Sequence, residues 1–458
     1  MGKKLAIIGL DCAEPSLVFG QWKNDLPNLS RLMDSGMHAR LRSCDPPITI
    51  PAWTAMFSGR DPGALGIYGF RNRVDYSYAG LKLADGRDVH ELRLWDYLSR
   101  AGKTSIVIGV PQTYPVFPLQ GYLIAGMPAE RFNEQSVYPP ALLDEIAQTA
   151  PQYAFDIKNF RNVERETLLR ELYQMTRQRF HLARHLLETR RWDLFVLVEI
   201  GPDRLQHAFW QYMAEDSIDF DPENPFRQVI FRYYQYLDFE IGTLLKRFDE
   251  QTDVLIVSDH GAKTFRGGFC INQWLINEGY LKLNAMPVRI EPFDPKKVDW
   301  NKTRVWAEGG YYARIFLNIK GREAQGAVVP ADVDNLKREL QVKLTQIVNP
   351  EGRPLNNIIL DPQRIYPQTR GIPPDLMVYC DDLNLRAIAS LGWDMVFTPS
   401  NDSGPDGANH DYHGIFIMQG AGIQSRQVDE ISIYDVLPTV LRRLGLPLAE
   451  NLPGKAWE

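Results

Sequence analysis

The sequence predicts an α/β fold with a largely parallel central sheet and helices on both of its faces. Six short runs are apolar without alternation, as expected of parallel strands that are covered on both sides. These runs are LAIIGL (5–10), SIVIGV (105–110), DLFVLVEI (193–200), DVLIVS (253–258), DLMVYC (375–380) and GIFIM (414–418). Between them, segments 162–190 and 226–248 repeat apolar residues at the helical period. Alternating strands and helices are typical of a three-layer α/β sandwich.

The elements follow in order from the first strand, which is too short for a signal-peptide core and meets Asp11 without a cleavage site. The stretch CDPPITIPAWTAMFSG (44–59) predicts a helix that begins near Thr49, since Pro51 suits a first turn, and ends at Gly59. A further helix is predicted to begin at Pro202.

The alternation of strands and helices weakens between about residues 280 and 370. This region holds a hairpin-like piece (311–323) and a helical piece (331–347), and the C-terminal stretch 434–447 is a short helix. We expect a core formed by 1–279 and 371–458, with 280–370 as an inserted cap.

Composition excludes several classes of protein. The chain has 458 residues and a net charge of -6, without the Lys/Arg runs of nucleic-acid-binding proteins. No apolar run approaches the roughly 18 residues of a transmembrane helix, so no membrane association is expected. The four cysteines are scattered without a CxxC pair, which favours a reducing, cytoplasmic location.

Potential metal ligands follow the predicted strands. Ligands of open α/β sheets collect at the carboxyl ends of the strands. Aspartate and histidine side chains stand at or near these positions in four places: Asp11, Asp203 with His207, Asp259 with His260, and His410 with His413. Asp203 and His207 are four residues apart, so a helix that begins at Pro202 places both on one face.

This set of ligands predicts two divalent ions rather than one. Carboxylates with neutral imidazoles suit zinc, although manganese and iron stay open. About six ligands exceed the need of one catalytic ion and suit two ions about 3.5–4 Å apart, as used for phosphoryl displacement. Thr49 is the candidate nucleophile, because a helix N-terminus favours an anion.

Five motifs, in order, resemble the alkaline phosphatase superfamily and most closely its type I phosphodiesterase/nucleotide pyrophosphatase family. They are IGLD, PPITIPAWTAMFSGRDP, PDRLQH, SDHG and NHDYHGIFIMQGAGI. The resemblance implies an alkaline-phosphatase-like three-layer sandwich and a phospho-threonine intermediate on Thr49. It implies that one ion is held by Asp11, Thr49, Asp259 and His260, and the other by Asp203, His207 and His410. The spacing before Gly414 favours His410 over His413 as the ligand.

The resemblance also implies a substrate class, a small phosphate diester or nucleotide. Asn72 is the candidate for binding the phosphate oxygens, with Arg71 as the rival. Sister activities on phosphomonoesters, phosphonates or phosphoglycerates would keep the same metals, and a non-catalytic binding protein is the alternative of another class. A sulfatase is disfavoured, because Ile48 stands where the Cys-x-Pro-x-Arg pattern needs arginine.

Overall fold

The computed structural model describes residues 3–218 and 220–458. Within them, a nine-stranded sheet has the order β20-β2-β19-β9-β1-β8-β5-β6-β7. Its strands are β1 (Lys4–Leu10), β2 (Met37–Arg42), β5 (Ser105–Ile108), β6 (Gly121–Ile124), β7 (Val137–Tyr138), β8 (Leu194–Glu199), β9 (Thr252–Val257), β19 (His413–Gln419) and β20 (Arg426–Ser432).

The middle of this sheet is parallel, as predicted. Strands β9, β1, β8, β5 and β6 pair side by side in one direction. Strand β19 runs antiparallel between β9 and β2, and β7 runs antiparallel at the far edge. The parallel strands β1, β8 and β9 are almost completely buried, which explains their continuous apolar sequences.

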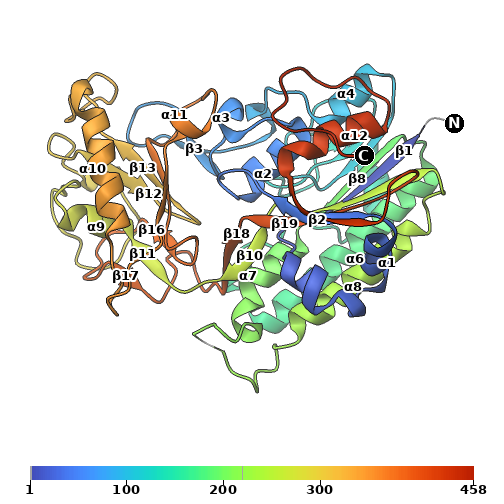
Figure 1. Cartoon of the computed structure of the whole chain (residues 1–458), viewed down its shortest axis with the longest axis horizontal. Coiled ribbons are helices and arrows are strands. Elements are labelled where there is room, and N and C mark those ends of the chain that lie inside the picture. Colours follow the sequence, from blue (N-terminus) through green and yellow to red (C-terminus); the bar gives the residue numbers. More distant parts are fainter. Residues whose placement is uncertain (1–2, 219) are drawn as a thin grey trace.

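Helices cover both faces of the sheet, so the three-layer prediction is confirmed. Figure 1 shows α2 (Thr49–Ser58), α4 (Leu94–Arg100) and α12 (Val436–Arg443) above the sheet. Below it lie α1 (Pro27–Ser35), α6 (Arg165–Thr189), α7 (Gly201–Met213) and α8 (Val229–Leu245), and α6, α7 and α8 pack against one another. The shorter α3 (Pro62–Leu65) follows α2, and α5 (Leu142–Thr149) packs on α6.

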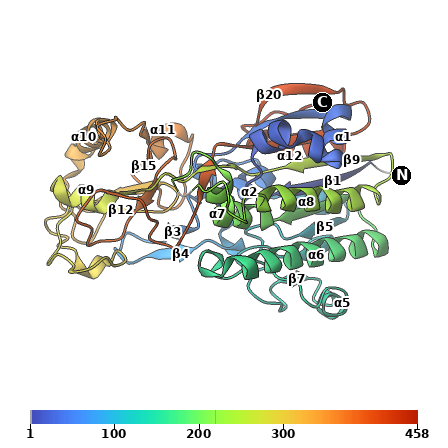
Figure 2. The same cartoon turned by 90° about the horizontal axis from the view of Figure 1, so that it is seen from below.

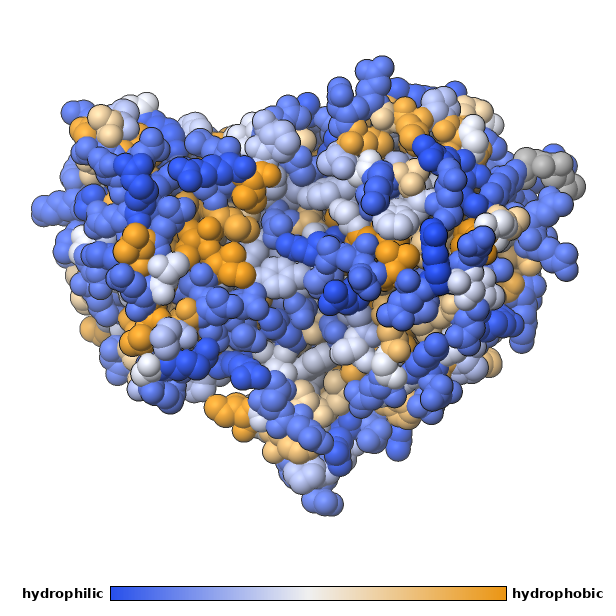
Figure 3. All heavy atoms as spheres, in the orientation of Figure 1, coloured by the Kyte–Doolittle hydropathy of each residue, from blue (hydrophilic) through white to orange (hydrophobic). Residues whose placement is uncertain are grey.

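A second lobe lies beside the central sheet (Figures 1 and 2). Its larger sheet has the order β12-β13-β15-β14, and its smaller sheet has the order β16-β11-β17. The elements of this lobe are β11 (Gly268–Cys270), α9 (Ile271–Asn277), β12 (Val305–Glu308), β13 (Ala313–Leu317), α10 (Val333–Thr345), β14 (Ile358–Leu360), α11 (Pro362–Ile365), β15 (Leu376–Tyr379), β16 (Arg386–Ile388) and β17 (Phe397–Thr398). The face in Figure 3 is mostly hydrophilic, with hydrophobic patches over both lobes.

Two further pairs of short strands lie outside these larger sheets. Strands β3 (Arg71–Arg73) and β4 (Leu81–Leu83) form one pair, and β10 (Gly261–Thr264) and β18 (Ala408–Asp411) form the other. In the part of the chain that the structure describes, no helix combines the length and apolarity needed to cross a bilayer.

Two sequence-based expectations differ from the structure in their pairing. The strand predicted at 375–380 forms as β15, but it pairs with β13 and β14 instead of joining the central sheet. An apolar run reports burial, and the second lobe has its own buried core, so the run alone does not identify the sheet. In the segment 311–323, β13 pairs with the preceding β12, not within the segment. The division into core and inserted cap stays a proposal.

Candidate metal centre

The carboxyl ends of three adjacent strands bring four of the candidate ligands together. Strand β1 lies between β8 and β9 in parallel register. Asp11 follows β1 directly, Asp259 and His260 follow β9, and Asp203 lies in the first turn of α7 after β8. All four side chains are at most 1% exposed. Buried carboxylates at one sheet edge need a compensating charge.

Thr49 is the first residue of α2 and faces this cluster. No side chain caps the helix N-terminus, so the N–H groups of its first turn are left for a ligand. The Thr49 Oγ1 lies 3.3 Å from His260 Nε2. The helix ends, as predicted, at Gly59, whose φ of 65° is readily adopted by glycine.

The second half of the cluster comes from α7 and β18. Helix α7 begins at Gly201, with Pro202 in its first turn, and Asp203 Oδ1 lies 3.2 Å from His207 Nε2 one turn later. Strand β18 pairs with β10 so that His410 stands opposite Ala262. His410 Nε2 is thereby placed 3.2 Å from His207 Nε2.

The donor atoms form two overlapping groups. Asp11, Asp259 and His260 offer donors that lie within 4.8 Å of one another, and so do Asp203, His260 and His410. The rings of His260 and His410 stack with centroids 3.7 Å apart. His260 therefore lies between the two groups, whereas the family resemblance implies that it belongs to the first.

The hydrogen bonds at the Nδ1 atoms of the three histidines turn their Nε2 atoms towards the cluster. His260 Nδ1 bonds to Gly261 O at 3.1 Å, His410 Nδ1 to Pro47 O at 2.8 Å, and His207 Nδ1 to Asp406 Oδ1 at 2.9 Å. Partners of this kind fix the tautomer and orientation of a metal-binding histidine.

Three carboxylate oxygens of the cluster are buried without a hydrogen-bond partner. They are Asp11 Oδ1, Asp203 Oδ1 and Asp259 Oδ2. The second oxygen of each carboxylate does accept a hydrogen bond, from Trp53 Nε1, Arg204 Nη1 and Cys12 N respectively. Buried polar atoms are rarely left unpaired, so these carboxylate oxygens and the Nε2 atoms beside them together fit divalent cations.

The electrostatics of the first ligand group, without a metal, point the same way. Burial, and then the charge of Asp203, raises the pKa of Asp11 well above its usual range, and burial with Asp11 does the same for Asp259. Burial lowers the pKa of His260 to about 4. The carboxyl groups of Asp11 and Asp259 therefore resist ionisation without a cation, while His260 stays neutral, as a metal ligand must. In the second group, nearby acidic charge outweighs burial and raises the pKa of His207 to about 10, so this histidine must lose a proton to bind a metal.

Five residues of the site were not identified from the sequence. Asp406 holds His207 and also accepts hydrogen bonds from Arg161 Nε at 2.6 Å and pairs with Arg386 Nη2 at 2.8 Å. Trp53 donates to Asp11, and Tyr311 from the second lobe contacts His207 Nε2 at 3.2 Å. None of these residues follows the carboxyl end of a strand of the central sheet. Their only sequence signal is that Asp406 and Trp53 each lie four residues from a candidate, His410 and Thr49 respectively.

Trp53 supports the first ligand group and yields a testable prediction. Its Nε1 donates to Asp11 Oδ2 at 2.7 Å, and its buried ring stacks on Phe57. Because Trp53→Phe removes the donor and keeps an aromatic ring, we expect the metal affinity to fall about 10- to 100-fold, as when outer-shell partners of metal ligands are lost. Titration of the metal-free variant with zinc would measure this, and an unchanged affinity would contradict it.

The remaining candidates lie in different surroundings. Asn72 Oδ1 accepts from Tyr68 N at 2.7 Å, and its Nδ2 donates to Gly69 O at 3.1 Å. Arg71 is exposed on β3. His413 is partly exposed and pairs with Glu430 at 2.7 Å. A role for Asn72 or Arg71 in binding phosphate stays a prediction.

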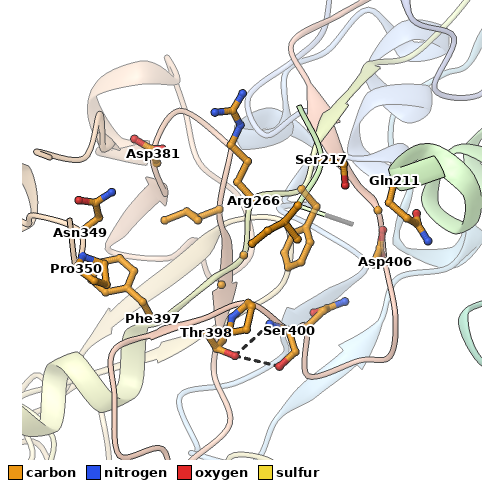
Figure 4. A pocket seen from close by; sticks show the side chains of 18 of the residues that line it. Gln211, Ser217, Arg266, Asn349, Pro350, Asp381, Phe397, Thr398, Ser400 and Asp406 are labelled. Atoms are coloured by element: carbon orange, nitrogen blue, oxygen red, sulfur yellow. Dashed lines mark hydrogen bonds between the residues drawn. The ribbon is translucent and has the colours of Figure 1, made fainter. Parts of the chain in front are cut away.

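A cavity of about 910 Å³ is lined in part by Asp406, the residue that holds His207 (Figure 4). Gln211 and Asp406 lie on one side of it, and Asn349, Asp381 and Phe397 lie on the other. None of the candidate ligands lines it among the described residues. The Asp406 carboxylate is fully buried and bonded to His207, so this residue connects the cavity wall to the second ligand group.

Comparison with known proteins agrees with this architecture. A family model described as type I phosphodiesterase / nucleotide pyrophosphatase matches residues 5–413. No curated protein sequence matches the chain. Solved structures of human ectonucleotide pyrophosphatase/phosphodiesterase 5 (14% identity, TM-score 0.59, covering 99% of this chain and 97% of that one) and of the murine protein (14%, 0.57, 99% and 98%) share the fold. A third, an inactive threonine-to-alanine variant of the murine protein with AMP, has a TM-score of 0.56 at 14% identity and covers 99% and 97%.

Proposed function

Because the chain belongs to the type I phosphodiesterase/nucleotide pyrophosphatase family and is thus a hydrolase of phosphoric ester bonds, we propose that it cleaves small phosphate diesters of the nucleotide type, with Thr49 as nucleophile and two divalent ions. The observation that carries the proposal is the position of Thr49. Its hydroxyl lies at an uncapped helix N-terminus and 3.3 Å from His260 Nε2, inside the ligand cluster.

The ligand cluster supports two metal sites. Asp11, Asp259 and His260 would hold one ion with Thr49, while Asp203, His207 and His410 would hold the other. When bound, such ions lower the pKa of a coordinated hydroxyl and offset the charge of phosphoryl oxygens. The nitrogen and carboxylate donors favour zinc over hard cations such as magnesium.

The chain's own residues then define the reaction. The Thr49 oxygen attacks phosphorus, and the bond to the leaving alcohol breaks with its electron pair on that alcohol's oxygen. Water next cleaves the phospho-threonine bond and restores the Thr49 hydroxyl. The N-terminus of α2 favours the anionic groups in both steps, because its N–H groups and dipole face them.

Two features of a related structure motivate the choice of nucleophile and substrate. The murine neighbour is inactive when a threonine is replaced by alanine, and it was solved with AMP. We therefore propose a nucleotide or related diester for this chain.

The four cysteines are all buried and free of disulfides, which supports a reducing compartment such as the cytoplasm.

One experiment on the purified wild-type chain tests this function. Bound zinc, manganese and iron are counted per chain, and hydrolysis of a p-nitrophenyl phosphodiester, a phosphomonoester, a phosphonate and a sulfate ester is compared. We expect about two ions and fastest cleavage of the diester. A faster monoester or phosphonate would identify a sister activity with the same site. No turnover after metal addition would instead favour a binding protein.

A further inference from the structure

The tip of the β12–β13 hairpin extends from the second lobe onto the metal centre. Gly310 exchanges two backbone hydrogen bonds with Ala387, at 2.8 and 3.0 Å. A side chain at Gly309 would meet Ala387 O at 2.4 Å, and Gly310 has a φ of 125°, so both positions require glycine. This fixed turn presents the next residue, Tyr311, to the ligands.

Tyr311 is held against the ligand histidines by its ring and by its hydroxyl. Its ring stacks on His410 with centroids 3.7 Å apart, and Arg386 lies 4.3 Å over the ring. Its hydroxyl lies 3.2 Å from His207 Nε2 and 3.2 Å from Arg161 Nη2, which donates to it. The hydroxyl is therefore on the side of His207 that faces the ligand cluster.

A bound metal changes what this hydroxyl can do. His207 Nδ1 is committed to Asp406, so Nε2 is the atom that a metal would take. Whichever of the two atoms carries the shared proton in the metal-free chain, a metal on Nε2 ends the contact between His207 and Tyr311. Arg161 can only donate, so it continues to occupy the phenol oxygen as an acceptor. Among the described residues, the hydroxyl has hydrogen bonds only to His207 and Arg161, so the phenol proton would then have no acceptor in that part of the chain.

We propose that Tyr311 is a substrate-binding residue, whose hydroxyl donates a hydrogen bond to a phosphoryl oxygen of the bound ester. This inference deepens the proposed function and rests on it. A phosphoryl oxygen is a charged acceptor, which a positioned phenol donor in a partly buried site stabilises more strongly than water does. The second lobe would thus supply one of the groups that hold the reacting phosphoryl group in place.

The test removes one oxygen atom and measures binding as well as rate. Tyr311→Phe keeps the ring on His410 and deletes the donor. We expect metal content per chain to stay unchanged and kcat/KM for the diester to fall about 10- to 100-fold. In the metal-loaded Thr49→Ala background, which prevents turnover, inorganic phosphate should bind about tenfold more weakly after Tyr311→Phe. Calorimetric titration measures this affinity.

Tyr280→Phe is the matched control. It removes the same atom from a second tyrosine of the same lobe, which is buried and whose hydroxyl bonds to Glu339 at 2.5 Å. Phosphate affinity and kcat/KM should both stay at wild-type values in this variant. The control separates loss of a phenol in general from loss of this one.

Three results would overturn the assignment of Tyr311. The first is equal phosphate affinity with and without the Tyr311 hydroxyl. The second is loss of metal from Tyr311→Phe, which would show that the residue supports His207 instead. The third is that the metal-loaded Thr49→Ala chain binds no phosphate. The proposed function would fail on a different result, namely that the wild-type chain does not cleave diesters or cleaves them without needing Thr49. Phosphate binding and diester cleavage thus test the two proposals separately.

Discussion

Thr49→Ala is expected to lower kcat for diester hydrolysis by at least about three orders of magnitude, because it deletes the attacking oxygen. Metal content should largely persist. Every other candidate ligand stays in place, and the three buried carboxylate oxygens that lack partners do not involve Thr49. Elemental analysis and a p-nitrophenyl phosphodiester assay on the same sample check both parts.

A second threonine on the same helix gives the control for this variant. Thr54 is buried, and its hydroxyl bonds to Ile50 O at 2.7 Å and to Gln112 at 3.0 Å. Thr54→Ala should cost about 1 kcal/mol of stability and leave kcat within about threefold. Full activity of Thr49→Ala would end the nucleophile assignment, whatever Thr54→Ala does.

His410→Ala is expected to remove about one ion per chain and to lower activity at least about 100-fold. His410 is 1% exposed, its Nδ1 is fixed by Pro47 O, and its Nε2 lies 3.2 Å from that of His207. No other histidine of the described residues occupies that position, so a lost imidazole leaves the second ligand group incomplete. Metal counting after gel filtration measures the loss, and thermal unfolding checks that the variant is folded.

His413→Ala is the companion variant, because both histidines precede β19 or begin it. His413 is paired at the surface with Glu430 at 2.7 Å, and such pairs contribute little to stability. Metal content and rate should stay near wild-type values. Loss of an ion from His413→Ala but not from His410→Ala would show that the ligand has been misassigned.

The parallel core was predictable from sequence because its strands are continuous apolar runs. The same pattern could not predict which sheet β15 joins, because a buried strand has the same apolar sequence pattern in either sheet. Site residues at strand ends, such as Asp11 and Asp259, were accessible because topology alone brings them together. Tyr311 and Asp406 were not, because their contacts depend on how the second lobe and the 400–407 loop pack against α7, which no local pattern encodes.

The sheet order also has a consequence for the way the chain is synthesised and folds. Strand β2 (Met37–Arg42) joins the parallel strands only through β19 (His413–Gln419). One of the first strands to be synthesised therefore cannot pair until one of the last has been made. Pairing over such a separation is slow, and an unpaired strand edge is a route to aggregation during translation. Arg40 and Arg42 make β2 a poor template for foreign strands while it waits, since charge at a strand edge opposes such pairing.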